Sequence, residues 1–598
     1  MLQKIRENRL VLATGALFIL LAVIHIPNSI YPHAFDKNGA PEFVTFILIA
    51  TLFGAFILLK PARFLYSGRV IQILWVLVGV TLISTIFSSD PIASLTGDTG
   101  RHAGLVSLFC LLVVAIFHSQ FSEIQIKRVI SIYLFGVWVV SVIGIFQYFK
   151  FFTLPGDVGV TSTLGNQDFF AALLGTTFPL IFFVLINSSI RVRVIVGLGT
   201  ASALYSLWLA GRRQAYVDIA ITLIVLAGSF AWKLLPKRNL SLNARSAFTT
   251  IAFVIWIEGI FLMPFLGKFI PVLGNDAQVK IRGQFWVAAL NTFLHNPIFG
   301  VGPDQYGNFY EQYRTIDSVK LFPTILSNDA HSATVQSLAT LGIVGALILV
   351  LLIGMLIRSF FIVMEREPER RKQYLALLLF AFVFLTNSAI SPITIPNKFL
   401  FWGISGFVIG KAYFVPKAKA VSAQVYWNFQ GIRYFTALAL ILSLFIGANF
   451  TLASVKFLNA LEKHATNSKA VIHYASNTYL PCSMYFDAEY FMLQNQGSKV
   501  LDKFAADKVS QHPRCPGPRL FLAREAYNKN DMKEMGRQIA ALEKIAPSRS
   551  DFLQAANYYA YKVGDERLKR QIVIQMEKVG IIEFTQGKKS SATSASSK

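Results

Sequence analysis

Cationic side chains and one histidine stand out in two parts of the sequence. The short turn 210–216 contains Arg212 and Arg213, and a longer polar stretch further along contains Arg282 and His331. Arginine guanidinium groups bind phosphate and diphosphate, often through two parallel hydrogen bonds. A histidine can accept or release a proton near neutral pH. These residue types therefore predict anion binding combined with proton transfer.

Several other chemistries lack their sequence patterns. The chain has no GxxxxGK[ST], HExxH or GxSxG motif, and no tryptophan-tryptophan-aspartate motif of metal-dependent oligosaccharyltransferases. The acidic residues of the polar stretch do not form the compact pattern that would hold a divalent metal. These residues are Asp276, Asp304, Glu311, Asp317 and Asp329. We expect a site without metal or cofactor.

The candidate residues sit in a strongly apolar chain. Of 598 residues, 54% are hydrophobic and 15% are charged, with a mean hydropathy of +0.52. Soluble domains carry about a quarter charged residues, so a simple soluble enzyme is excluded. The first apolar span follows three basic residues and lacks a cleavage site, so we expect a retained helix. The sequence predicts an all-α bundle of thirteen membrane spans near 10–27, 43–59, 70–87, 103–118, 129–149, 169–186, 194–210, 215–231, 248–266, 336–357, 374–391, 399–414 and 434–450.

Lysines and arginines predict the orientation of these spans. One set of alternate loops carries about twice as many of them as the other, which places the N-terminus in the cytoplasm. The odd number of spans then places the C-terminal part outside, together with the turn 210–216 and a large loop at 267–335. The formal net charge of +24 is mostly this topology signal, and we infer no nucleic-acid binding from it. We expect a transmembrane domain at 1–450, a helical domain at 451–585 and a disordered tail at 586–598.

The predicted outer domain contains a repeat. AYNKND at 526–531 is echoed by AYKVGD at 560–565, a shift of 34 residues that is the tetratricopeptide period. Paired helices of this kind stack into an α-solenoid, which binds a partner or packs on its own protein. Of the three cysteines, Cys482 and Cys515 lie in this domain, where an oxidising compartment permits a disulfide between them.

Three stretches resemble motifs of the bacterial O-antigen ligase/polymerase superfamily. They are RGQFWVAAL at 282–290 followed by HNPIFGVG, AHSATVQSL at 330–338 followed by GIVG, and RQAY at 213–216. Weaker similarity to the family's first two outer loops lies around Asp90-Pro91, Gly97, Arg101, Gly104-Leu105 and Gly165-Asn166. Two departures stand out, because Ser332 replaces a usual asparagine and Arg212 a frequent serine. The second departure leaves two candidate arginines, of which Arg213 fits the motif better.

The resemblance implies metal-independent transfer of a glycan from a polyprenyl-diphosphate carrier to an acceptor hydroxyl, with inversion at C1. It makes Arg213, Arg282 and His331 the catalytic candidates, with the arginines on the diphosphate and the histidine as base. It adds Arg212, Arg101, Arg314 and Trp286 as substrate-binding candidates. It also implies a multi-pass protein of the bacterial inner membrane, with an extracytoplasmic site.

Each of these residues also has an alternative role in structure or in lipid contact. The arginines would also suit lipid headgroups, and His331 a structural hydrogen bond. Asp218 would neutralise one arginine of the 212–213 pair, and Glu258, placed in mid-span, would face the bundle interior.

Competing functions also remain open. Within the family, ligation of a finished glycan, transfer to a protein hydroxyl and polymerisation of repeat units share one chemistry. A transporter or flippase is a different class, but it predicts ionisable groups near mid-membrane in several spans, and these are almost absent here. A scaffold whose tail recruits partners would need far fewer spans.

Overall fold

The computed structural model describes most of the chain as helix. The described residues are 2–24, 40–59, 64–65, 68–98, 101–151, 159–231, 241–267, 269–270, 275–323, 325–413, 415–416, scattered positions between 434 and 445, and 498–581. Apart from the two-residue strands β1 (Phe64–Leu65) and β2 (Val415–Pro416), which pair antiparallel, the regular elements in these ranges are helices. This confirms the all-α prediction.

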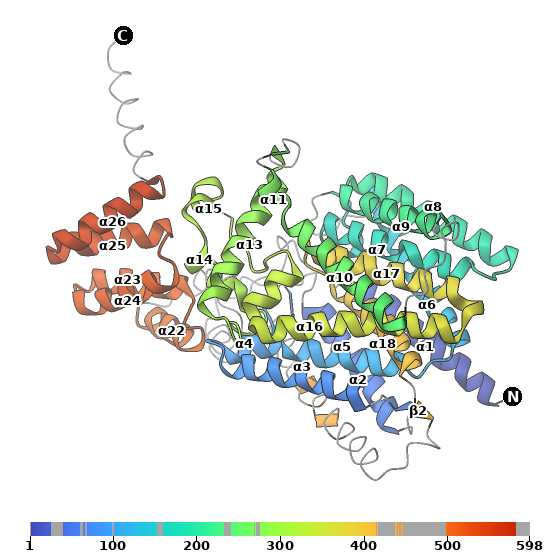
Figure 1. The fold of residues 1–598 in the computed structure, drawn as a ribbon. Helices are drawn as coiled ribbons and strands as arrows, with labels where there is room; N and C mark the ends of the chain where they lie inside the picture. Colours follow the sequence, from blue (N-terminus) through green and yellow to red (C-terminus); the bar gives the residue numbers. More distant parts are fainter. Residues whose placement is uncertain are drawn as a thin grey trace. The chain divides into compact units, whose positions relative to one another are not determined.

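The chain divides into two compact units (Figure 1). The first unit contains residues 1–82, 99–261 and 345–455, and the second contains 83–98, 262–344 and 456–598. The second unit therefore groups the predicted outer loop with the C-terminal helices and with a short segment from near residue 90. We call it the outer unit and the first one the membrane unit.

The membrane unit contains the long apolar helices. Its described helices are α1 (Leu2–Val23), α2 (Ala40–Leu59), most of α3 (Gly68–Ile86), α5 (Leu105–His118), α6 (Glu123–Tyr148), η1 (Ser162–Leu164), α7 (Gln167–Leu185), α8 (Ile190–Ala210), α9 (Arg213–Ala231), α10 (Leu242–Phe261), the later part of α16 (Ala333–Arg366), η3 (Pro368–Arg370), α17 (Arg371–Ser388) and α18 (Ile395–Ala412).

Helix α7 lies at the centre of this unit. It contacts α6, α8, α9 and α17, and most of its side chains are buried. Asn166 starts α7 by accepting the backbone N–H of Asp168 at 2.7 Å. Such caps satisfy backbone donors that a helix leaves without intrahelical partners. The start of α7 is therefore well defined. Arg212, one of the candidate substrate-binding residues, contacts this helix start.

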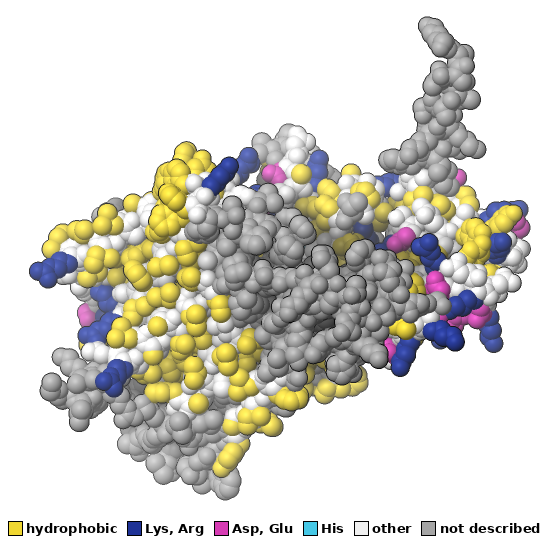
Figure 2. Space-filling model, turned by 180° about the vertical axis from the view of Figure 1, so that it is seen from behind, with side chains coloured by type: hydrophobic (Ala, Val, Ile, Leu, Met, Phe, Trp, Pro, Cys, Tyr) yellow, Lys and Arg dark blue, Asp and Glu magenta, His cyan; other side chains and the backbone are white. Residues whose placement is uncertain are grey.

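The exterior of the membrane helices is apolar. Large hydrophobic side chains are exposed along α8, α9, α10 and α16, and Figure 2 shows hydrophobic side chains over a broad face of the molecule. Leu198 and Ile224, for example, are each 69% exposed. Large contiguous apolar surfaces are typical of contact with lipid or another protein. Five described helices are long and apolar enough to cross a membrane, namely α6, α7, α8, α10 and α16.

Each of the first twelve predicted spans overlaps a described helix. The thirteenth, 434–450, lies largely outside the described residues. The chain is thus a helical protein with several membrane-spanning segments, while the number of spans and their orientation stay predictions.

The outer unit is built from shorter helices. They are α4 (Pro91–Thr96), α11 (Met263–Leu266), α13 (Ala277–His295), α14 (Tyr306–Tyr313), α15 (Ile316–Leu321), the first turns of α16, and the C-terminal helices α22 (Ser498–Gln511), α23 (Pro516–Asn528), α24 (Met532–Ile545), α25 (Ser550–Val563) and α26 (Glu566–Lys578).

The C-terminal helices follow the 34-residue spacing seen in the sequence. Helices α23 and α25 begin at positions 516 and 550, and α24 and α26 begin at 532 and 566. Asp531 and Asp565 cap the second helix of each pair, and each accepts a backbone N–H at 2.9 Å. Successive helices pack on one another around a shared hydrophobic core. The tetratricopeptide assignment itself stays a prediction, and residues 451–497 lie outside the described part.

The cysteines differ in state. Cys110 is buried and free, as expected for a packing residue. Cys515 is disulfide-bonded, and Cys482 lies outside the described residues.

Candidate active site

His331 lies in a tight turn between α15 and α16. Its backbone N–H donates to Asp329 Oδ1 at 2.6 Å, and its Nδ1 lies 2.9 Å from the carbonyl oxygen of Asp329. Because a carbonyl only accepts, Nδ1 carries the proton in this contact, and the neutral ring then has its lone pair on Nε2. The backbone of His331 has a φ of +56°, a conformation that costs a side-chain-bearing residue of order 1–3 kcal/mol. The turn therefore holds the histidine in the tautomer that a base at Nε2 requires.

Helix α13 brings Arg282 to the same region. Asp276 starts the helix by accepting the N–H groups of Gln278 and Val279 at 2.8 and 3.1 Å. Phe285, one turn after Arg282, packs on the His331 ring with 5.1 Å between centroids. Arg282 is half-buried. The structure thus places Arg282 within one helical turn of the residue that contacts His331.

A backbone clasp joins the end of α13 to the start of α16. Val301 and Gly302 donate their N–H groups to the carbonyls of Ala339 and Thr340, both at 3.0 Å. Ile343 donates to the Pro297 carbonyl at 2.9 Å. These bonds fix the turns after α13 against the helix that follows His331.

Glycine is needed where the two backbones of this clasp meet. Gly342 has a φ of +68° and interrupts α16, and a Cβ there would lie 2.1 Å from the carbonyl oxygen of Ile298. Gly300 also has a φ of +68°, and its Cβ would meet the backbone of Thr340 at 2.3 Å. Only glycine combines this backbone conformation with so close an approach. The clasp thus explains two glycines of the family-like motifs, Gly300 and Gly342.

The segment near residue 90 braces the same loops. Ser84 Oγ donates to the Phe299 carbonyl at 2.7 Å. Asp98 accepts from Asn328 Nδ2 at 2.8 Å, and its own N–H donates to Asp304 Oδ2 at 2.7 Å. Three stretches far apart in the sequence therefore converge around the turn that carries His331.

Arg314 has a structural set of partners in this unit. Its Nη2 donates to the carbonyls of Ser318 and Phe322 at 3.0 and 2.9 Å, and its guanidinium lies over the Tyr310 ring. These bonds satisfy carbonyls at the end of α15. Trp286 is 2% exposed, so in this structure its ring is a packing surface of α13. The substrate-binding roles of both residues stay predictions.

The other predicted arginines belong to the membrane unit. Gly211, with a φ of +65°, ends α8, and the chain turns at once into α9, which begins at Arg213. Arg212 bonds to Gln167 and lies 3.4 Å from Asp168 Oδ1. Arg213 is exposed and makes no ion pair with any residue that the structure describes. This difference favours Arg213 as the arginine available to a ligand.

Arg101 lies at the same helix start as Arg212. It is 7% exposed, and its guanidinium lies 5.7 Å from the centre of the Phe169 ring. Phe169 belongs to the first turn of α7, as do the two partners of Arg212. The structure therefore brings Arg101 and Arg212 together at the N-terminus of α7, an end that favours anions.

A buried polar cluster was not predicted from the sequence. Asn387 Nδ2 donates to Thr176 Oγ1 at 2.9 Å and to Asp218 Oδ2 at 2.8 Å, and Gln214 also bonds to Asn387. The cluster joins α7, α9 and α17. Asp218 therefore accepts a hydrogen bond from the Asn387 amide, whereas the sequence predicted that it would neutralise an arginine. The polar residues at 214 and 218, one turn apart on an otherwise apolar helix, were the signal for it.

The expectation for Glu258 is wrong. Glu258 is exposed and lies in the last turn of α10, so its side chain does not face the bundle interior. The predicted span ran on to residue 266 and so made the position central.

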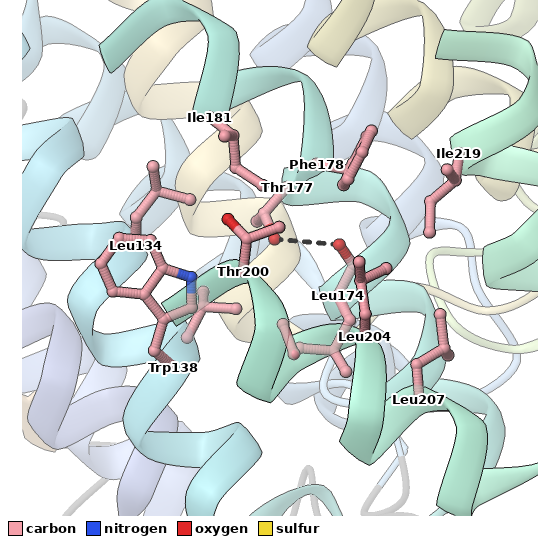
Figure 3. Close-up of a pocket in the computed structure, with 12 residues that line it drawn as sticks. Leu134, Trp138, Leu174, Thr177, Phe178, Ile181, Thr200, Leu204, Leu207 and Ile219 are labelled. Carbon is pink, nitrogen blue, oxygen red and sulfur yellow. Dashed lines mark hydrogen bonds between the residues drawn. The ribbon is translucent and has the colours of Figure 1, made fainter. Parts of the chain in front are cut away.

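A small pocket between α6, α7, α8 and α9 does not carry the chemistry. It is lined by aliphatic and aromatic side chains with Thr177 and Thr200, and none of its lining residues is titratable at neutral pH (Figure 3). Thr177 bonds to the Leu174 carbonyl of its own helix at 3.2 Å, as Figure 3 shows. This pocket is ordinary imperfect packing within the membrane unit.

Within the described part of the chain, no three His, Cys, Asp or Glu side chains are grouped as metal ligands. No curated protein matches the chain. A family model described as O-antigen ligase matches residues 171–350, a range that contains Arg213, Arg282 and His331. This match confirms the resemblance of this part of the chain to the O-antigen ligase family.

Proposed function

We propose that the protein transfers a glycan from a polyprenyl-diphosphate carrier to an acceptor hydroxyl, at the outer face of the bacterial inner membrane. The family match supports membrane glycosyl transfer of the ligase or polymerase type. The single observation that carries the proposal is the His331 turn, because its contacts with Asp329 leave Nε2 as the basic atom.

In this mechanism the acceptor oxygen attacks C1 of the donor sugar while His331 Nε2 takes its proton. The bond between C1 and the diphosphate oxygen breaks, and the anomeric centre inverts. Arg282 neutralises charge that grows on the diphosphate, and the resemblance assigns the same role to Arg213. Loss of one such electrostatic contact costs roughly 10²–10³ in rate. A diphosphate is already an activated leaving group, so the proposed reaction uses no metal or nucleotide.

Three acceptor classes remain within this chemistry. Ligase-type transfer to a lipid or wall glycan comes first. Transfer to a protein hydroxyl comes second, because the C-terminal helical domain offers a surface for a protein acceptor. Polymerisation of repeat units comes third.

The test replaces His331 with alanine in the native gene and measures the lipid-linked glycans that accumulate. We expect transfer to fall by about 10²–10⁴, the usual size of general base catalysis. Long untransferred chains would indicate a ligase or protein transferase, and the acceptor that loses its glycan would say which. Single repeat units would indicate a polymerase.

His295→Ala is the matched control. His295 is the last residue of α13, the helix that carries Arg282; it is exposed and bonds through Nδ1 to the Asn291 carbonyl. Its loss should leave the glycan profile unchanged. An unchanged profile for the His331 variant, at normal membrane level, would remove this residue from the mechanism and favour the transporter class.

A further inference from the structure

Helix α14 lies between the C-terminal helices and the region of His331. Its residues fall on two faces, because side chains four positions apart point the same way along a helix. Tyr306 and Tyr310 form one face, and the other is formed by Asn308, Phe309 and Gln312. Within the outer unit, each face has its own set of contacts.

The face with Phe309 is held by Arg514, which lies between α22 and α23. The guanidinium carbon of Arg514 lies 3.6 Å from the centre of the Phe309 ring. Its Nε donates to the Asn308 carbonyl at 3.1 Å, and its Nη2 donates to Gln312. One planar cation thus makes three contacts on a helix that lies about 200 residues away in the sequence. A lysine cannot reproduce that geometry, because its charge is a single point without a planar fork.

Arg514 is half-buried in this contact. Loss of water lowers the pKa of its guanidinium to about 10, still far above neutral pH, so the charge persists. A desolvated cation over an aromatic ring contributes more than an exposed one. The contact is therefore a defined anchor between the C-terminal helices and α14.

Three further contacts join the C-terminal helices to the outer loops. Arg549 Nη1 lies 3.2 Å from Glu311 Oε1 on α14. His512 Nδ1 lies 2.8 Å from Asp90 Oδ2, and both side chains are buried. Val319 of α15 belongs to the same hydrophobic core as α23 to α26. The C-terminal helices are thus packed on the outer loops by apolar and polar contacts together.

The opposite face of α14 reaches the candidate base. Tyr306 donates its hydroxyl to the Phe285 carbonyl at 2.8 Å, and burial raises the pKa of Tyr306 well above its ordinary value, so the hydroxyl stays protonated. The Tyr310 ring packs edge-on against Phe285 at 5.7 Å. Phe285 in turn packs on the ring of His331. A continuous chain of contacts therefore runs from Arg514 through α14 and Phe285 to His331.

We propose that Arg514 is a positioning residue for glycan transfer, through which the C-terminal helices set the place of His331. The proposal rests on the proposed function. The C-terminal domain would then affect the rate of transfer. A repeat domain that did not contact the outer loops would only recruit partners. Its physical basis is that displacement of a reacting group by about 1 Å can cost 10²-fold in rate.

The experiment compares purified full-length variants on lipid-linked glycan extracted from membranes of a host that lacks the gene, with those membranes as the acceptor source. We expect Arg514→Ala to lower kcat by about tenfold or more while KM for the lipid-linked glycan changes by less than about twofold. Arg514→Lys should recover part of the loss. Arg537→Ala is the control, because Arg537 pairs with Glu534 of its own helix and is exposed.

A double variant separates positioning from general destabilisation. If Arg514 acts through His331, Arg514→Ala should cause little further loss in protein that already carries His331→Ala. An equal fold-loss in both backgrounds, or no loss in either, would overturn the proposal. If the Arg514 variant fails to accumulate in membranes, Arg549→Ala carries the same test through its contact with Glu311. If His331→Ala leaves the rate of glycan transfer unchanged, that result would instead refute the proposed function, whatever the Arg514 variants do.

Discussion

In the membrane unit, one buried side chain, Asn387, bonds to side chains of two other helices, whereas in the outer unit Ser84 and Tyr306 bond to backbone carbonyls of distant segments. Asn387 joins α17 to Thr176 and Asp218 on two other helices. By contrast, Ser84 donates to the carbonyl of Phe299 in a loop, and Tyr306 donates to the carbonyl of Phe285 on α13. The outer unit has irregular backbone whose polar groups need partners. Membrane helices satisfy their own backbone, so a polar side chain such as Asn387 is free to connect neighbouring helices.

The candidate arginines of the two units also differ in their surroundings. Arg213 begins a membrane helix and is exposed. Arg282 is half-buried within a helix that is braced at both ends, by the Asp276 cap and by the clasp after residue 296. Rigid bracing of the helix and loops that carry candidate residues is what pre-organised electrostatic stabilisation requires.

The largest expected effect tests the pair of arginines in the membrane unit. Arg213→Ala should lower transfer by roughly 10²–10³, the cost of one lost electrostatic contact with a leaving group. Arg212→Ala should lower it much less, because Arg212 is held by Gln167 and Asp168. Transfer rates in membranes with matched protein levels measure both. Equal losses would mean that exposure and partnering do not distinguish the two residues.

The next effect tests the clasp of the outer unit. Gly342→Ala should destabilise the protein by about 3 kcal/mol, from a strained left-handed backbone and overlap with the Ile298 carbonyl. Gly259→Ala in α10 is the control, because a Cβ there meets nothing within 4 Å. Thermal inactivation of detergent-solubilised protein reports the difference. A Gly342 variant as stable as the Gly259 variant would show that the clasp does not hold the outer unit together.

The smallest effect tests the side-chain cluster of the membrane unit. Asn387→Ala should cost about 1–2 kcal/mol, a typical value for hydrogen bonds between membrane helices. Ser388→Ala should cost less, because Ser388 bonds to the Leu385 carbonyl of its own helix. The same inactivation assay compares the two. A larger loss for Ser388 would contradict the view that contacts between helices stabilise this unit.

Apolar runs and caps made much of the fold predictable. Twelve predicted spans overlap helices because a segment buried in lipid or in a bundle must be both apolar and helical. The 34-residue echo correctly anticipated the spacing of α23 to α26, since Asp531 and Asp565 each start a helix. The prediction for Glu258 was wrong, because an apolar run does not show where the helix within it ends.

The sequence by itself determined the helical membrane class, the resemblance to O-antigen ligases and the choice of Arg213, Arg282 and His331 as candidates. These features depend on composition and on local motif spacing, which can be recognised without knowing any tertiary contact. Only the tertiary structure decided the tautomer of His331, the partners that separate Arg212 from Arg213, and the contacts of Arg514 with α14. These depend on residues up to hundreds of positions apart, and a contact between Asp90 and His512 leaves no trace in either local sequence.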